Sequence, residues 1–165
     1  MKKGEIRLYN VIFPIWLIWL APQVLCVVLP VNFLIDLAAV AIALAALGLR
    51  PVWKQAVGVI WRVWFFGFLA DIAGAALLLG VLCLPGNGWL NDAIQAMASN
   101  PFQNPAALCF VCGAILVSAA LIYVCNRFIC LKNLRASLRQ KRCIALTLAI
   151  ATAPYAFLLP TRWFF

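Results

Sequence analysis

Two carboxylates stand in stretches that are otherwise apolar enough to cross a membrane. Asp71 lies near the middle of the run from residue 52 to residue 84, and Asp36 lies in the apolar run before it. A charge at bilayer depth costs roughly 2.5–3.5 kcal/mol on insertion scales, so such residues face protein or a wet cavity. A carboxyl group there either holds a proton or stays ionised beside a cation, which makes it a candidate ligand for an ion or a polar substrate.

The helical face around Asp71 consists mainly of small residues. Positions three or four residues away share a helical face, and small residues let a second helix approach closely. We therefore expect Asp71 to point at protein. Two interpretations stay open, a polar link between helices or an ion, proton or substrate site. The neighbours on this face are Gly67, Gly74, Ala75 and Leu78.

Asp36 shares a helical face with Asn32, and Ala39 and Ala43 continue that face. If a helix begins at Asn32, Asp36 lies only about 6 Å from its start at 1.5 Å per residue. The pair then either caps the helix at the membrane interface or forms a second polar site near the outer mouth of a pathway. Asp71, Asp36 and Asn32 are the candidate ion- or substrate-binding residues.

Seven cysteines are present, and Cys109 and Cys112 form a C-x-x-C at the outer end of a predicted helix. Such a thiol pair can exchange with a disulfide and pass electrons to a quinone. The arrangement resembles that of membrane thiol oxidoreductases of the vitamin K epoxide reductase type, and the resemblance covers these four residues. The alternative is that the cysteines are small apolar packing residues.

Most other enzymatic chemistry is excluded by the residue types. The chain has no histidine, so histidine-based zinc sites and Ser-His-Asp triads cannot form. Intramembrane aspartyl proteases use Tyr-Asp and Gly-x-Gly-Asp, whereas the two aspartates here stand in NFLID and FLADIAG. We therefore expect no metal or cofactor and favour a protein without catalytic residues, and enzyme activity stays open only as the thiol chemistry of Cys109 and Cys112.

The composition requires lipid as part of the solvent. Of 165 residues 67% are hydrophobic and the mean hydropathy is +1.06, whereas soluble domains are about 45–50% apolar. The net charge of +9 comes from 13 basic and 4 acidic residues. The basic residues stand at the ends of apolar runs, which is typical of positive-inside flanks and not of nucleic-acid binding. Residues 1–165 are predicted to form a single membrane domain.

The pattern predicts an all-α, polytopic integral membrane helical bundle with about five transmembrane helices. A turn at 29–32 is needed because the first apolar run is too long for one span. Five crossings place the basic groups at Lys2–Arg7, 50–54 and 127–142 on one side, which gives a cytoplasmic N-terminus and an outer C-terminus. The predicted helices are 8–29, 32–49, 53–84, 105–130 and 143–160, the last interrupted by Pro154, with an outer loop over 85–104.

The cytoplasmic segment 127–142 is strongly basic. Lys132, Arg135 and Arg139 fall on one face of a predicted short amphipathic helix. Such clusters attract anionic lipid head groups at about 1 kcal/mol per charge, although the positive-inside signal alone also explains them. In the outer loop, a short interfacial helix is predicted to turn Trp89, Leu90, Ile94 and Met97 to the apolar side and Asp92 and Gln95 to water.

Three functions fit these observations, all in the cytoplasmic membrane. The first is a small transporter or channel for an ion or solute, a homo-oligomer in which Asp71 responds to protons or cations. The second is a non-catalytic subunit whose small-residue faces bind a larger membrane protein. The third is a quinone-linked thiol oxidoreductase using Cys109 and Cys112.

Overall fold

The structure is a computed structural model that describes residues 15–85 and 88–160. All regular elements in these two ranges are helical, which confirms the predicted all-α class. The five α-helices are α1 (Ile15–Ala46), α2 (Val52–Leu82), α3 (Trp89–Ser99), α4 (Pro105–Cys125) and α5 (Leu138–Ala151). Short 3-10 helices cover Pro101–Gln103 and Tyr155–Leu158, and a π-helix covers Asn126–Cys130.

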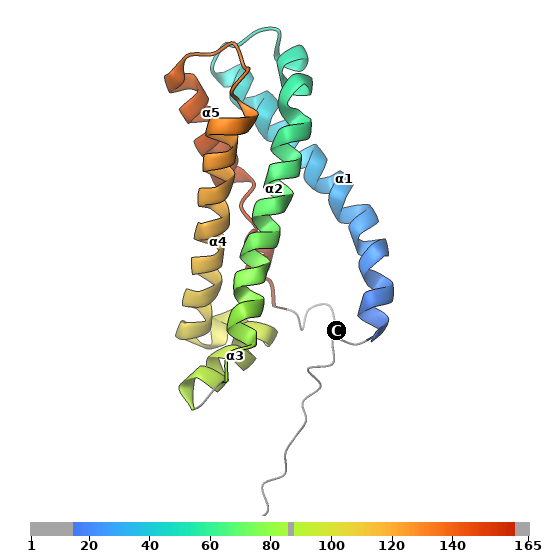
Figure 1. The fold of residues 1–165 in the computed structure, drawn as a ribbon, viewed down its shortest axis with the longest axis vertical. Coiled ribbons are helices and arrows are strands. Elements are labelled where there is room, and N and C mark those ends of the chain that lie inside the picture. The colour runs from blue at the N-terminus through green and yellow to red at the C-terminus, as the bar shows by residue number, and fades with distance from the viewer. Residues whose placement is uncertain (1–14, 86–87, 161–165) are drawn as a thin grey trace, which may run out of the picture.

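The four long helices run alternately up and down (Figure 1). The loop between α1 and α2 and the connection between α4 and α5 lie at one end of the bundle, and α3 lies at the other. Four segments are long and apolar enough to cross a membrane: Val28–Ala46, Val52–Leu82, Pro105–Cys130 and Leu138–Leu158.

Large apolar side chains cover the outside of this bundle. Leu116 on α4 is 70% exposed and Trp61 on α2 is 65% exposed. Contiguous apolar surface of this kind is unfavourable in water and is normal where hydrocarbon is the solvent. The chain is therefore a multi-pass membrane protein.

The predicted turn at residues 29–32 is wrong. Helix α1 continues through Pro22 and Pro30 as one element of 32 residues. Prolines are tolerated in membrane helices because neighbouring groups and local adjustments satisfy the freed backbone. One helix therefore replaces the two predicted over 8–29 and 32–49, and it starts at the end of the bundle opposite the loop between α1 and α2 (Figure 1).

The region between α4 and α5 also differs from the prediction. Residues 131–137 form turns instead of a basic amphipathic helix, because Leu131 and Leu134 are buried in the core. A capping box between Ser137 and Gln140 begins α5 at residue 138, not 143. The helix ends at Ala151, before the predicted interruption at Pro154.

The other helix boundaries agree closely with the sequence. Helix α2 covers the predicted span from residue 53 to within two residues of its end, and α4 with its π-helix reaches residue 130 as predicted. Helix α4 begins at Pro105 because the side chain of Asn104 accepts hydrogen bonds from the first free backbone N–H groups. In α3, Met97 is buried and Asp92 and Gln95 are exposed as expected, but Trp89 is exposed as well.

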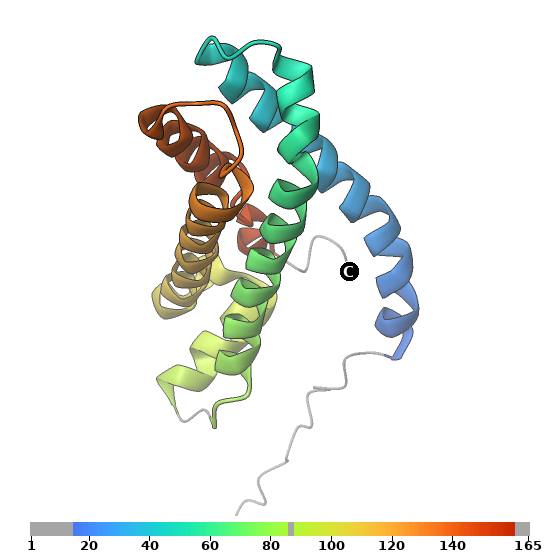
Figure 2. The same ribbon diagram turned by 45° about the horizontal axis from the view of Figure 1, so that its top comes forward.

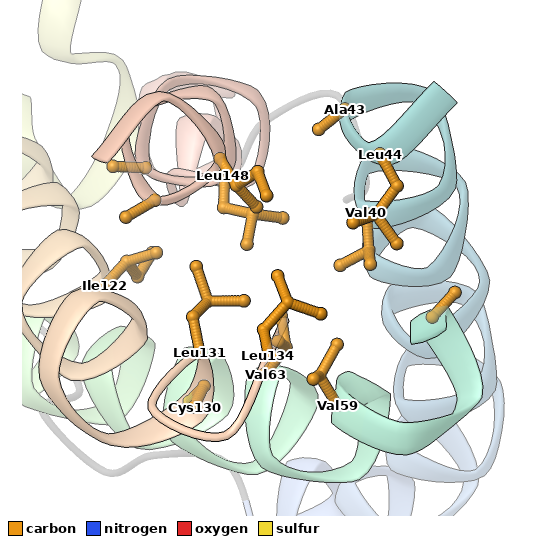
Figure 3. Packing of buried hydrophobic residues seen from close by; sticks show 14 of the residues in the cluster. Val40, Ala43, Leu44, Val59, Val63, Ile122, Cys130, Leu131, Leu134 and Leu148 are labelled. Atoms are coloured by element: carbon orange, nitrogen blue, oxygen red, sulfur yellow. The ribbon is translucent and has the colours of Figure 1, made fainter. Parts of the chain in front are cut away.

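Two apolar clusters hold the helices together. The larger one lies toward the end of the bundle that carries the two basic connections, and its side chains converge from α1, α2, α4, the following turn and α5 (Figure 3). The smaller one joins α3, α4 and the segment after α5. Labelled members of the large cluster are Val40, Ala43, Leu44, Val59, Val63, Ile122, Cys130, Leu131, Leu134 and Leu148.

The basic residues of the described chain gather at one end of the bundle. All of them lie within residues 50–62 and 127–142. These residues form the loop between α1 and α2, the connection between α4 and α5, and the adjoining helix ends (Figure 2). The opposite end carries α3 with Asp92. The two basic connections lie at the same end, as predicted. Because α1 replaces two predicted helices, its start lies at the opposite end, and the described residues provide four candidate crossings in place of the predicted five. The assignment of the basic end to the cytoplasm stays a prediction. The predicted N-terminal flank at 2–7 and the C-terminal segment 161–165 lie outside the described residues.

Cysteine labelling tests this orientation. In a background without the seven native cysteines, Lys132→Cys should react with an impermeant thiol reagent only after the cells are opened. Asn91→Cys on α3 should react in intact cells, because its loop lacks basic residues. Position 132 is preferable to Ser137, whose side chain caps α5. Labelling of position 132 from outside intact cells contradicts the assignment.

Candidate functional site

The three polar residues singled out in the sequence line one cavity. It has a volume of about 430 Å³ and lies between α1, α2 and the segment that follows α5. Asn32 and Asp36 come from α1 and Asp71 comes from α2. The cavity adjoins the small apolar cluster, since Ala153 and Phe157 belong to both. The fold thus brings both aspartates of the membrane-spanning helices into one cavity.

Asp36 is buried at the contact between α1 and α2. Its side chain is 6% exposed, and a Cβ atom added to Gly67 would lie 3.6 Å from its Oδ2 atom. The carboxyl group of Asp36 therefore packs directly against α2 at Gly67. Because α1 does not begin at Asn32, Asp36 lies in the middle of the span Val28–Ala46 and not near its outer end as predicted.

Asp71 faces the same cavity from α2. Its Oδ1 atom is buried and has no hydrogen-bond partner among the described residues. The two carboxyl groups are close enough to interact electrostatically, and Thr152 lines the same cavity. The helical face of small residues predicted around Asp71 is a site of helix packing, since both Gly67 and Gly74 are buried.

The third wall of the cavity is an interrupted helix. Helix α5 ends at Ala151, and Pro154 lacks the backbone N–H that would continue it. The backbone N–H and the hydroxyl of Thr152 both donate to the carbonyl of Leu148, each at 2.9 Å. The hydroxyl of Tyr155 donates to the carbonyl of Ile150 at 2.7 Å. This helix end directs a partial negative charge toward the cavity.

Aromatic residues fix α1 against α2 beside the carboxylates. The indole N–H of Trp64 donates to the carbonyl of Leu29 at 3.2 Å. The ring of Phe33 lies 5.2 Å from that of Trp61 and 6.1 Å from that of Trp64. Trp64 is therefore a helix-packing residue and a cavity wall, and the contact lies next to Pro30, where the sequence predicts a turn.

The cavity is acidic and contains no opposing cation. None of the described lysines and arginines lines it. In the part of the chain that the structure describes, no three His, Cys, Asp or Glu side chains come together as metal ligands. Two carboxyl groups, carbonyl oxygens and a hydroxyl are hard oxygen ligands. The arrangement suits a proton or a cation held by oxygen atoms.

Two residues of this site were not identified from the sequence. Thr152 and Trp64 line the cavity with the aspartates. The position of Thr152 two residues before Pro154 is a usable signal, because a polar side chain beside a helix break at membrane depth must find partners. Trp64 gives no such signal, since tryptophan is expected at the membrane interface.

Cys109 and Cys112 lie outside this cavity. Both are free and exposed on the first turns of α4, so neither is an interior packing residue. Cys130, by contrast, is fully buried in the large cluster. The redox hypothesis stays a prediction.

Alanine substitution tests the cysteine pair. Replacing Cys109 and Cys112 together should change the free energy of unfolding by less than about 0.5 kcal/mol, because exposed positions are tolerant. Cys130→Ala should cost clearly more, since it opens space in the core. A mixed disulfide trapped at position 109 or 112 supports the redox function instead.

The chain has no recognised relative to guide this interpretation. It matches no protein-family model, no curated protein and no solved structure.

Proposed function

We propose that the protein moves a proton or a small cation, alone or coupled to a solute, across the cytoplasmic membrane. One observation supports this proposal: Asp36, Asp71 and the interrupted end of α5 line the same cavity at membrane depth. The basic end of the bundle faces the cytoplasm, and the end that carries α3 faces outward.

Electrostatics favour a positively charged ligand. Two neighbouring carboxylates repel each other in a medium of low dielectric constant, so they share a proton or hold a cation between them. None of the described basic side chains lines the cavity, so in this proposal the bound proton or cation supplies the compensating charge. The unpartnered Oδ1 atom of Asp71 supplies an acceptor for it.

The interrupted helix supports the same function. Backbone that leaves helical geometry inside a membrane is tolerated where it is buried in protein or lines a water-filled cavity. Membrane transporters commonly bind coupling ions at the ends of discontinuous helices near the bilayer midplane, through carbonyl groups and partial negative charge. Residues 151–157 occupy such a position beside the two aspartates.

The hypothesis of a non-catalytic subunit loses part of its support. The small-residue faces that suggested a partner pack within this chain, since Gly67 adjoins Asp36, and Gly74 adjoins Ser118. Association into a homo-oligomer stays a prediction. Native mass spectrometry of the purified protein measures its copy number.

Flux measurements on purified protein in liposomes test the proposal. A pH-sensitive dye inside the vesicles reports proton movement under an imposed potential, and parallel assays use Na⁺ and K⁺ gradients. The protein should accelerate the movement of at least one of these ions over empty liposomes. A correctly folded preparation that moves none of them, alone or with a co-purified solute, contradicts the proposal and favours the subunit hypothesis.

A further inference from the structure

A second cavity lies at the basic end of the bundle. Its volume is about 620 Å³, and its walls are the loop between α1 and α2, the first three turns of α2, and the turn that follows α4. It shares no lining residue with the carboxylate cavity. An inference about it is therefore independent of the proposed transport function.

Four cationic side chains line this cavity. Arg50 comes from the loop, Lys54 and Arg62 come from α2, and Arg135 comes from the turn after α4. None of the described acidic residues is among the lining residues. Four like charges that converge on one space repel each other, and an anion bound among them removes that repulsion.

The cavity is open and carries amide groups beside the cations. A Cβ atom added to Gly58 would meet no atom within 4 Å, so the glycine leaves space beneath the cations. The side-chain amide of Gln55 donates to the carbonyl of Arg50 at 3.0 Å and ties the loop to α2. Asn133 adds an amide on the opposite wall. These groups form a concave site, in contrast to an evenly spread basic surface.

The depth of the cavity matches the lipid headgroup region. Helix α2 has 31 residues, which is about 46 Å at 1.5 Å per residue, whereas the hydrocarbon core is about 30 Å thick. Arg62 lies ten residues from the start of α2, about 15 Å below it. Trp53, which is 67% exposed, marks the interfacial level. The cavity therefore extends from the aqueous loop to the edge of the hydrocarbon.

We propose that this cavity binds the phosphate of an anionic phospholipid headgroup. Arginine side chains bind phosphate through paired, charge-assisted hydrogen bonds, and three of the four cations are arginines. Basic sites between membrane helices on the cytoplasmic side are suited to anionic headgroups. The acyl chains extend along the apolar outer face of α2, where Val57 and Trp61 are exposed.

The experiment compares two variants with the same net charge. Arg62→Gln with Arg135→Gln removes two cations from opposite walls of the cavity. The control is Arg139→Gln with Arg142→Gln, two exposed arginines on α5 that do not line it. Each detergent-purified protein is titrated with phosphatidylglycerol, phosphatidylcholine or inorganic phosphate, and the shift in Tm reports binding to the folded state.

Phosphatidylglycerol should raise the Tm of the wild type and the control, and phosphatidylcholine should have little effect. In the cavity variant the apparent affinity for phosphatidylglycerol should fall roughly 30-fold, about fivefold for each charge removed. The Tm in phosphatidylcholine verifies that each variant is folded. Equal weakening in both variants overturns the proposal in favour of diffuse attraction. Stabilisation by inorganic phosphate without any by phosphatidylglycerol overturns the assignment to lipid.

Discussion

Replacement of Asp71 by asparagine should reduce ion flux to the level of empty liposomes and leave the fold intact. Asparagine keeps the size of the side chain and much of its hydrogen bonding, but it cannot ionise. It therefore neither releases a proton nor neutralises a cation. Any dependence of the flux on pH should disappear with the flux. The flux is measured after the variant is reconstituted at the same protein density as the wild type. Size-exclusion chromatography tests whether the variant is folded.

Two further aspartate variants complete the test. Asp36→Asn should have the same effect, because both carboxyl groups line one cavity. Asp92→Asn is the matched control, since Asp92 is exposed on α3 and lies outside the cavity. A folded Asp71→Asn variant with the flux of the wild type removes Asp71 from the mechanism. If asparagine is tolerated and Asp71→Leu weakens assembly, the residue is a structural link between helices.

Gly74→Ala should destabilise the bundle, whereas Gly80→Ala should not. A Cβ atom at residue 74 would overlap the hydroxyl of Ser118 and approach the ring of Phe157 to 3.1 Å. The Ser118 hydroxyl cannot turn away freely, because it donates to the carbonyl of Ala70 at 3.0 Å. At Gly80 no atom lies within 4 Å of the added Cβ. Overpacking of this kind costs about 1–3 kcal/mol.

The comparison between the two glycines isolates the packing effect. Both lie within α2, so the gain in helix propensity from alanine, about 1 kcal/mol, is the same in each and cancels. Unfolding in mixed micelles with increasing SDS gives the free energies. Combining Gly74→Ala with Ser118→Ala should recover part of the loss by removing the overlapping oxygen. Equal stability of the two single variants would show that α2 and α4 are not closely packed at Gly74.

The sequence by itself determined the class of the protein and the identity of the two carboxylates within its apolar helices. A composition that is 67% hydrophobic leaves lipid as the only solvent that can cover so much apolar surface. Aspartates are costly at that depth wherever they stand, so Asp36 and Asp71 are conspicuous without a structure. The small neighbours of Asp71 likewise indicate close helix packing, because side-chain size is a local property.

The tertiary structure decided whether Pro30 breaks the helix. Proline disrupts an isolated helix strongly, but α1 packs against α2 there, and Trp64 contacts the backbone beside it at Leu29. That contact joins residues 35 positions apart, which a local pattern does not contain. The prediction of two helices over 8–49 failed for this reason, and the expected outer position of Asp36 failed with it.

The tertiary structure also decided which polar groups share a site. The pairing of Asp36 with Asp71 depends on the rotation of α1 about its axis and on the crossing of α2, and both are set by side-chain packing across helices. The break before Pro154 is visible in the sequence, but its position beside the aspartates is not. The basic residues likewise show one property that the sequence reveals and one that only the fold reveals. Their charge predicts the cytoplasmic side locally, whereas only the fold brings Arg50, Arg62 and Arg135 around one cavity.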